Sequence, residues 1–192
     1  MKLGDVAIVR SSFTARGGVQ GSTGGVLAIQ QSDFTAEGFA GVEFLARTDE
    51  AVSRHVLTYG DILFRSRGQF TTAWVVPEEI KEPAIAVMPL FVIRPNRVKV
   101  NSHYLAWVLN QRASQQYFRQ SSQGQTIQMI SKSVLENVEL RLPPLDRQEQ
   151  IAKAATLAAQ QQRLEARLLQ CRHQLIDLQL QSAAQDSPNT AR

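Results

Sequence analysis

Cysteine is almost absent from this sequence, since Cys171 is the only one among 192 residues. A lone cysteine can neither close an internal disulfide nor form a cysteine-based zinc site, and we expect a buried, unreactive thiol. Long apolar runs are missing as well, because none approaches the ~20 residues that span a bilayer. The opening MKLGDVAIVRSS lacks the positive-then-apolar pattern of a secretion signal. We therefore expect a cytoplasmic protein without membrane contact.

The motifs of several enzyme classes are also missing. The glycine-rich stretch ARGGVQGSTGG lacks the lysine and the strand-to-helix setting of a phosphate-binding loop, and a flexible loop explains it better. His55, His103 and His173 lie far apart in the sequence, without the spacing of metal ligands. The sequence therefore predicts no metal and no cofactor.

Two enzymatic alternatives rest on short patterns. Pro143-Pro144 invites comparison with the Asn-Pro-Pro-Tyr loop of adenine methyltransferases, but leucines occupy the places of the polar and aromatic residues. Asp61 with Glu79-x-Lys81 superficially resembles a metal-dependent nuclease site. A turn at Asp61 and a solvated loop around Glu79 and Lys81 are the better interpretation.

The charge that is present is mildly positive. The net charge is +4, and residues 1–145 hold 15 Lys and Arg against 12 Asp and Glu, so this part is +3 and the remainder +1. This balance permits contacts with phosphates but does not require a nucleic acid as partner. The hydrophobic content of 43% is sufficient for one globular core.

Short runs rich in Val, Ile, Leu and Phe predict an α+β domain with a curved, mostly antiparallel sheet and short helices. One helix is predicted from His103 to about Arg119, with Asn101 or Ser102 as its N-cap. A shorter helix is predicted after Ser133, whose spacing to Glu136 matches a capping box. The predicted strands are VAIVR, GGVLAIQ, VEFLA, ILFRS, AWVV, AIAVMPLFVI and VELRL.

A long helix is predicted after Pro143-Pro144, which ends the last strand because proline has no backbone donor. Asp146 is the expected N-cap, and neither proline nor glycine recurs before Pro188. Up to about Ser182 the helix would measure roughly 55 Å at 1.5 Å per residue, which is too long for the preceding domain to cover.

Apolar residues along this helix recur at spacings of three and four, which predicts a coiled-coil seam and a partner helix. The alternative is an amphipathic helix folded back on its own domain. The sequence alone does not decide between parallel and antiparallel pairing. The predicted dimerisation residues are Leu157, Leu164, Leu168, Cys171, Leu175 and Leu178, with Gln161 at the one vacant position.

Side chains suited to DNA recognition occur in three places. Some alternate along a segment after ILF that we expect to be extended, some recur at helical spacing between 103 and 119, and some lie in glycine-containing loops. Arginine and glutamine can read base edges, while serine and threonine can hold phosphates. The predicted DNA-binding residues are Arg16, Gln20, Ser22, Arg65, Arg67, Gln69, Thr71, Arg112, Gln116, Arg119, Gln123 and Gln125.

Several short motifs follow one another in order across most of the chain. They are Lys2-Leu3-Gly4-Asp5-Val6, Leu57-Thr58-Tyr59-Gly60-Asp61-Ile62-Leu63-Phe64 with Gly68, Tyr104-Leu105, Gly124 with Thr126-Ile127 and Ile130-Ser131, and above all Leu142-Pro143-Pro144-Leu145 with Gln148, Gln150 and Ile151. By these motifs the chain resembles one half of a specificity subunit of type I restriction-modification enzymes.

The resemblance implies a non-catalytic subunit that selects a DNA sequence, while partner methyltransferase subunits modify adenine and a restriction subunit drives cleavage. It implies a DNA target-recognition domain over residues 1–143 and a spacer and dimerisation helix over 144–185. The residues after the helix, 186–192, are expected to form a disordered tail. Specificity subunits carry two such domains, whose helices pair antiparallel. This chain has one of each, so we expect a homodimer that reads an interrupted inverted repeat in double-stranded DNA. The alternative is a coiled-coil interaction protein, or a remnant module, that docks a partner without binding DNA.

Overall fold

The structure, a computed structural model, describes residues 1–14, 25–35, 38–39, 46–48, 54–68, 71–122 and 129–185. The chain divides into two compact units, Met1–Ala152 and Lys153–Arg192. The first unit contains all the described strands and short helices and the first turns of one long helix, and the second unit, as far as it is described, is the remainder of that helix.

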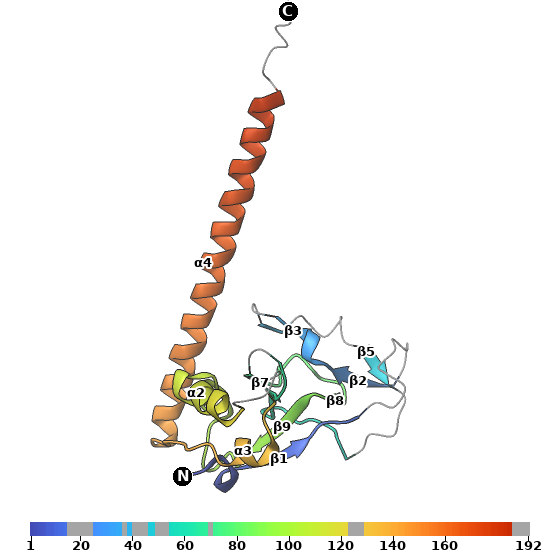
Figure 1. Ribbon diagram of the computed structural model, residues 1–192, viewed down its shortest axis with the longest axis vertical. Coiled ribbons are helices and arrows are strands. Elements are labelled where there is room, and N and C mark those ends of the chain that lie inside the picture. Colours follow the sequence, from blue (N-terminus) through green and yellow to red (C-terminus); the bar gives the residue numbers. More distant parts are fainter. Residues whose placement is uncertain are drawn as a thin grey trace, which may run out of the picture. The chain divides into compact units, whose positions relative to one another are not determined.

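A four-stranded antiparallel sheet forms the centre of the first unit (Figure 1). Ile62 and Phe64 point into one hydrophobic cluster, while Leu63 between them points into another, because alternate side chains of a strand face opposite sides. Both faces of the sheet are therefore buried. Its strand order is β1-β9-β6-β7, with β1 at Ala7–Ser11, β9 at Leu90–Pro95, β6 at Ile62–Arg65 and β7 at Thr72–Val75.

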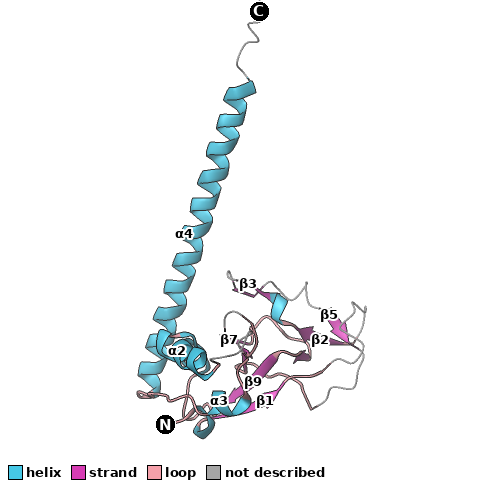
Figure 2. Cartoon of the chain, in the orientation of Figure 1, coloured by secondary structure: helices cyan, strands magenta, loops and turns pink. Residues whose placement is uncertain are grey.

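Helices cover one face of this sheet (Figure 2). Phe118 is fully buried and packs on Phe64 of β6 with ring centroids 5.1 Å apart, which fixes the helix that carries it on the sheet. The elements on this face are the 3-10 turn η1 at Leu3–Asp5, α1 at Ser102–Asn110, α2 at Arg112–Ser121, α3 at Lys132–Glu136 and the first two turns of α4, which spans Leu145–Gln185.

A smaller sheet covers the other face. Its centre is β2, which pairs antiparallel with β5 and parallel with β8. Phe34 stacks on Trp74 of β7 at 4.4 Å between ring centroids and joins this part to the central sheet. This sheet contains β2 at Val26–Ile29, β5 at Ala46–Thr48 and β8 at Ala84–Ala86. Beside it lie the 3-10 turn η2 at Gln31–Asp33 and a separate two-stranded antiparallel sheet of β3 at Phe34–Thr35 and β4 at Gly38–Phe39.

The predicted fold class, an α+β domain with a mostly antiparallel sheet, short helices and a long C-terminal helix, is confirmed. Two of the predicted strands differ. AIAVMPLFVI divides into β8 and β9, which enter different sheets. VELRL forms a single β-bridge, between Glu139 and Lys2, although Val138 and Leu140 are buried. VEFLA lies outside the described residues except for Ala46.

The predicted helix over 103–119 is wrong in one respect, because it consists of two helices. Gln111 has extended backbone angles, φ −71° and ψ 154°, and separates α1 from α2. Asn101 caps α1 as predicted, since its side-chain oxygen accepts from the backbone N–H of Tyr104. The cap of α3 is Ser131 rather than Ser133, so the predicted capping box is wrong, because Val134 and not Glu136 occupies the N3 position.

The 41 residues of α4 measure about 62 Å at 1.5 Å per residue. Its N-cap was also predicted wrongly: the first helical hydrogen bond runs from the Gln148 N–H to the Pro144 carbonyl, so Asp146 lies inside the first turn. Every described side chain from residue 156 to residue 184 is exposed. Cys171 is among them, so the expectation of a buried thiol does not hold for the single chain. None of the described helices has the length and apolar content to cross a membrane.

Candidate nucleic-acid interface

Residues 83–135 contain six Lys and Arg and no Asp or Glu, a local imbalance that the overall charge of +4 conceals. This stretch includes β9, α1 and α2, which lie on or beside the central sheet. Arg94 and Lys132 pair with carboxylates outside the stretch, Asp61 and Glu136, and the other four cations leave an excess of positive charge that favours contact with phosphate groups. This asymmetry is visible in the sequence only when charge is counted segment by segment, because the charges of residues 1–145 as a whole nearly balance.

The segment after ILF was predicted to be extended, and this prediction is wrong. β6 ends at Arg65 and β7 begins at Thr72, and the two strands pair antiparallel as a hairpin with Arg65 opposite Thr72. Gly68 has a positive φ of 124°, a conformation that favours glycine, in the turn between them. The chain therefore reverses here, and the predicted donors do not form one stripe along a strand.

The two arginines of this hairpin differ in surroundings. Arg65 is half-buried, and its Nε donates to the Arg67 carbonyl at 3.2 Å. One of its Nη atoms would lie 2.8 Å from a Cβ at Gly68, so the guanidinium uses the space that a side chain would fill. The backbone of Arg67 forms an isolated β-bridge with Met129. Its side chain is exposed and has no described carboxylate within ion-pair distance. Arg67 is thus the arginine that is free to meet a ligand.

A hollow of about 450 Å³ lies beside Arg67. Residues of the connection between β2 and β3 line this hollow. They are absent from the predicted contacts because this connection carries no sequence motif. The side-chain oxygen Oε1 of Gln31 is buried there and has no hydrogen-bond partner within the described residues. An amide next to an exposed guanidinium is a donor and acceptor set suited to base edges. The hollow is lined by Gln30, Gln31, Ser32, Arg67, Gly68, Met88 and Pro89.

The predicted stripe on the helix is present on α2, where Arg112, Gln116 and Arg119 are all exposed. Their spacings of four and three place them on one face, opposite the buried Phe118. No described carboxylate pairs with either arginine. These are the conditions under which a guanidinium can hold a phosphate.

Thr71 is a different case from the other predicted contacts. It is buried, and its hydroxyl donates to Oε1 of Gln115 at 2.9 Å, which joins the end of the hairpin to α2. A buried, hydrogen-bonded hydroxyl holds the two elements together instead of facing a ligand, so we remove Thr71 from the candidate contacts. The remaining predicted contacts, Arg16, Gln20, Ser22, Gln69, Gln123 and Gln125, lie outside the described residues, as do the glycine-rich stretch before Gly25 and the predicted disordered tail.

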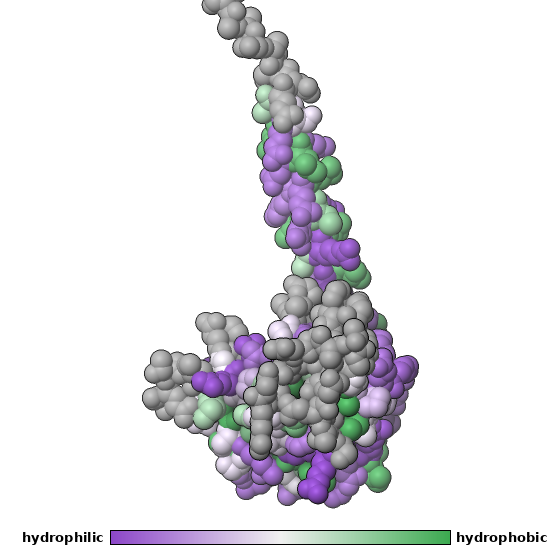
Figure 3. Space-filling view, turned by 90° about the vertical axis from the view of Figure 1, so that its right-hand side faces the viewer, coloured by the Kyte–Doolittle hydropathy of each residue, from purple (hydrophilic) through white to green (hydrophobic). Residues whose placement is uncertain are grey.

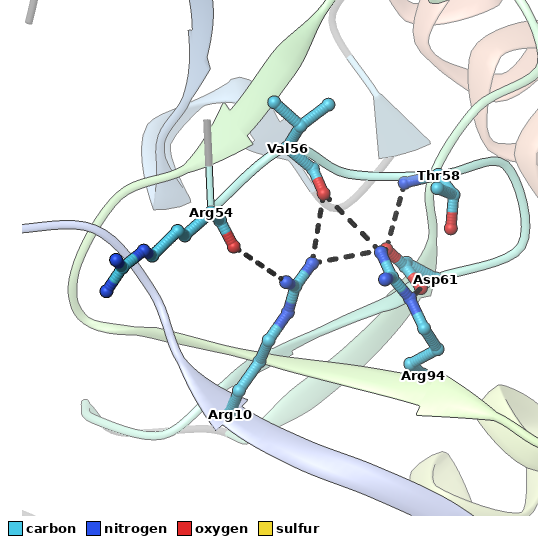
Figure 4. Close-up of polar contacts among 6 residues, drawn as sticks. All are labelled: Arg10, Arg54, Val56, Thr58, Asp61 and Arg94. Carbon is cyan, nitrogen blue, oxygen red and sulfur yellow. Dashed lines mark hydrogen bonds and ion pairs between the residues drawn. The ribbon is translucent and has the colours of Figure 1, made fainter. Parts of the chain in front are cut away.

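Asp61, a member of the suggested nuclease trio, is held in a structural ion cluster (Figure 4). Its side chain is 1% exposed and accepts two hydrogen bonds from Arg94, at 2.6 and 2.8 Å, and one from the Thr58 backbone at 2.9 Å. Arg10 is 3.7 Å away and donates to the carbonyls of Arg54 and Val56. Glu79 and Lys81 are exposed. Among the described residues, no three His, Cys, Asp or Glu side chains gather as metal ligands.

The pKa values of the two arginines in this cluster are shifted in opposite directions. The hydrogen bonds to Asp61 raise the pKa of Arg94 above its ordinary value. Burial lowers the pKa of Arg10, and repulsion from Arg94 acts in the same direction, while Asp61 opposes both. One carboxylate thus serves two guanidinium groups, and the cluster carries one excess positive charge.

The Pro143-Pro144 segment also has a structural role. Gln148 is fully buried, and its Nε2 donates to the Pro143 carbonyl at 2.8 Å while its Oε1 accepts from the Asn101 N–H at 2.9 Å. The Tyr104 hydroxyl donates to the Arg141 carbonyl at 2.7 Å. These contacts join the start of α4 to the start of α1, so the motif that resembles a methyltransferase loop is engaged in packing.

The second unit presents an apolar surface. Exposed leucines recur along α4, where apolar side chains alternate with polar ones (Figure 3). Leu164 is 68% exposed and Leu175 57% exposed in the single chain. Leu157, Leu168, Cys171 and Leu178 are exposed with them, so the predicted seam is present on the helix surface.

The chain thus combines an α+β domain that carries exposed arginines with a long helix that carries an apolar seam. Residues 22–170 match the family model of the type I restriction modification DNA specificity domain, and the chain belongs to this family. The predicted family is thereby confirmed.

Three relatives show the extent of the likeness. A Methanocaldococcus jannaschii protein assigned as the specificity subunit of the type I restriction enzyme MjaX is 29% identical over 107 residues, 54% of this chain and 25% of that protein. The HsdS subunit of Thermoanaerobacter tengcongensis aligns with a TM-score of 0.61 at 20% identity over 85% of this chain and 37% of that one. A chain from a structural study of complex assembly in the type I R-M system gives 0.63 at 20% identity, over 95% of this chain and 43% of that one. The chain thus spans less than half the length of each relative.

Proposed function

We propose that this chain binds double-stranded DNA in a sequence-specific manner, as a specificity component of a type I restriction-modification system. The observation that carries the proposal is that Arg67, Arg112 and Arg119 are exposed without a described carboxylate, in a domain that belongs to the DNA specificity family. An arginine with no acidic partner keeps its full charge and hydrogen-bonding capacity for a phosphate or a base.

The contacts divide by chemistry. Arg67, with Gln31 beside it, reads base edges, because guanidinium and amide groups recognise guanine and adenine in the major groove. Arg112, Gln116 and Arg119 hold phosphates and set the position of the domain on the duplex. Arg65 supports Arg67 through the carbonyl that its Nε contacts. The loop contacts complete the set: Arg16, Gln20, Ser22, Gln69, Gln123 and Gln125.

The proposed working unit is a homodimer. The exposed seam of α4 pairs antiparallel with that of a second copy, so that two identical recognition domains, residues 1–143, read the halves of an interrupted inverted repeat. In this arrangement residues 144–185 act as spacer and dimerisation helix. The protein itself is non-catalytic and acts in the cytoplasm, where methyltransferase subunits, and a restriction subunit if the system includes one, assemble on it to modify or cleave the selected DNA.

Selection from a random duplex library, followed by titration of the selected site, tests this function. We expect wild-type protein to enrich a split palindrome, and Arg65→Ala/Arg67→Ala to lose specific binding by at least about a hundredfold. Lys81→Ala, an exposed cation outside the proposed interface, is the control and should bind normally. No enrichment by wild-type protein, together with intact partner assembly, would instead identify a coiled-coil interaction protein that does not bind DNA.

A further inference from the structure

The seam residues of α4 define a heptad frame. With Leu168 and Leu175 at position a, the d positions hold Leu157, Leu164, Cys171 and Leu178, while Gln161 and Ser182 fill the other a positions. The flanking e and g positions hold only a few charges between residues 157 and 182. They are Glu165 and Arg172 at e, and Arg167 at g.

We propose that α4 pairs with a second copy in one antiparallel register, centred between Leu168 and Cys171, and that Glu165 and Arg172 select this register. The inference rests on the homodimer of the proposed function and specifies how its helices meet. In an antiparallel pair an a residue faces a d residue of the other copy. Leu168 then faces Cys171 of the second copy, Leu164 faces Leu175, Gln161 faces Leu178, and Leu157 faces Ser182.

Charge complementarity carries the choice of register. In an antiparallel pair the e positions of the two helices lie side by side, so Glu165 of each copy meets Arg172 of the other, and symmetry makes two such pairs. Both side chains are exposed. Glu165 accepts a hydrogen bond from Nε2 of Gln161 at 2.9 Å, and neither Glu165 nor Arg172 forms an ion pair with a described residue. Both charges therefore remain available to a partner helix.

The competing arrangements bring like charges together. A shift of one heptad in one direction places Glu165 beside Glu165 of the second copy, and a shift in the other direction places Arg172 beside Arg172. A parallel pair joins each g position to the following e position of the other copy, which places Arg167 beside Arg172. Like charges at such positions destabilise the pair. Among these four arrangements, the proposed one alone forms two opposite-charge contacts.

The proposed register also buries the lone cysteine, Cys171. Cys171 is exposed in the single chain but faces Leu168 of the second copy in the proposed register, beside the two-fold axis. A cysteine in an apolar environment behaves as a small hydrophobic residue. The expectation of a buried thiol would then hold for the dimer.

Charge reversal in the full chain, without DNA, tests the register by sedimentation equilibrium at low ionic strength. Glu165→Arg and Arg172→Glu should each raise the dimer dissociation constant by about tenfold or more, because two attractive contacts become repulsive. The double variant Glu165→Arg/Arg172→Glu should restore wild-type affinity, since each exchanged pair is again of opposite sign. Asp177→Arg, a reversal on the outer face of α4, is the matched control and should leave the constant unchanged. Helix content is followed by circular dichroism in every variant.

The other outcomes overturn the inference in distinguishable ways. Tighter association of Arg172→Glu indicates a parallel pair, in which the introduced carboxylate would meet Arg167 of the second copy. Unchanged dimer dissociation constants for both single variants would show that Glu165 and Arg172 do not select the register, but would not contradict the homodimer. A monomeric wild-type protein removes the homodimer as well, while sequence-specific DNA binding is judged separately by the duplex selection.

Discussion

Asp61 is buried between two arginines, so this member of the suggested nuclease trio has a structural role. Asp61→Asn removes the charge that compensates Arg10 and Arg94, and we expect it to lower the free energy of unfolding by about 2 kcal/mol. This is less than the loss of a fully buried pair, because both arginines are partly exposed. Urea denaturation measures the effect. Glu79→Gln, at an exposed member of the same pattern, should change stability by less than about 0.5 kcal/mol. Magnesium-dependent DNA cleavage that both substitutions abolish would contradict the structural role.

Gln148 is a second residue whose role comes from its contacts. Gln148→Leu leaves the Asn101 N–H and the Pro143 carbonyl without their partner, and we expect a loss of about 2 kcal/mol in the free energy of unfolding. The neighbouring Gln150 is exposed and accepts a hydrogen bond from the exposed Arg147, so Gln150→Leu should have an effect within about 0.5 kcal/mol. Thermal or urea unfolding compares the two variants. Equal losses would show that helix propensity, which both substitutions alter, dominates over the buried contacts.

The helix α2 is the element on which the phosphate contacts are proposed. Arg112→Ala and Arg119→Ala should each weaken binding to specific and random duplexes alike, because phosphate contacts carry no sequence information. Each substitution should also reduce the slope of log affinity against log salt concentration by about 1. Titrations of a labelled duplex at several salt concentrations measure both quantities. Ser121→Ala, which changes an exposed, uncharged residue of the same helix, is the control. A loss confined to one DNA sequence would make these arginines base readers.

The elements themselves were largely predictable where local pattern decides them. The runs VAIVR, ILFRS and AWVV correspond to β1, β6 and β7, and the absence of proline and glycine after Pro144 marks α4. What could not be predicted depends on contacts between distant residues. The extended Gln111 that divides α1 from α2 lies in an ordinary helical pattern of residues. The strand β8 pairs with β2, which lies far earlier in the sequence.

The candidate site was less predictable for the same reason. Arg67 and the α2 arginines could be selected as exposed cations, but the reversal of the chain after Arg65 depends on its pairing with β7. Thr71 alternates with the arginines in sequence, yet the hairpin turns it toward Gln115 and buries it. Gln31 carries no motif at all, and only the fold brings it to the hollow beside Arg67.

At the scale of the whole molecule, the proposed function requires that two copies are joined through α4. Leu168→Glu/Leu175→Glu places charges at adjacent a positions of the seam, where each glutamate would face an apolar residue of the second copy. We expect light scattering to give the mass of a monomer, while the thermal transition of the first unit is retained because its core contains neither residue. The monomer should protect one half of the split palindrome and bind it more weakly, because the second recognition domain no longer acts at a high effective concentration. Leu180→Glu is the control: Leu180 is also exposed but lies outside the seam, so the variant should remain a dimer. A double variant that keeps the mass of a dimer would place the self-association outside α4. The length of this helix would then not determine the spacing of the two half-sites.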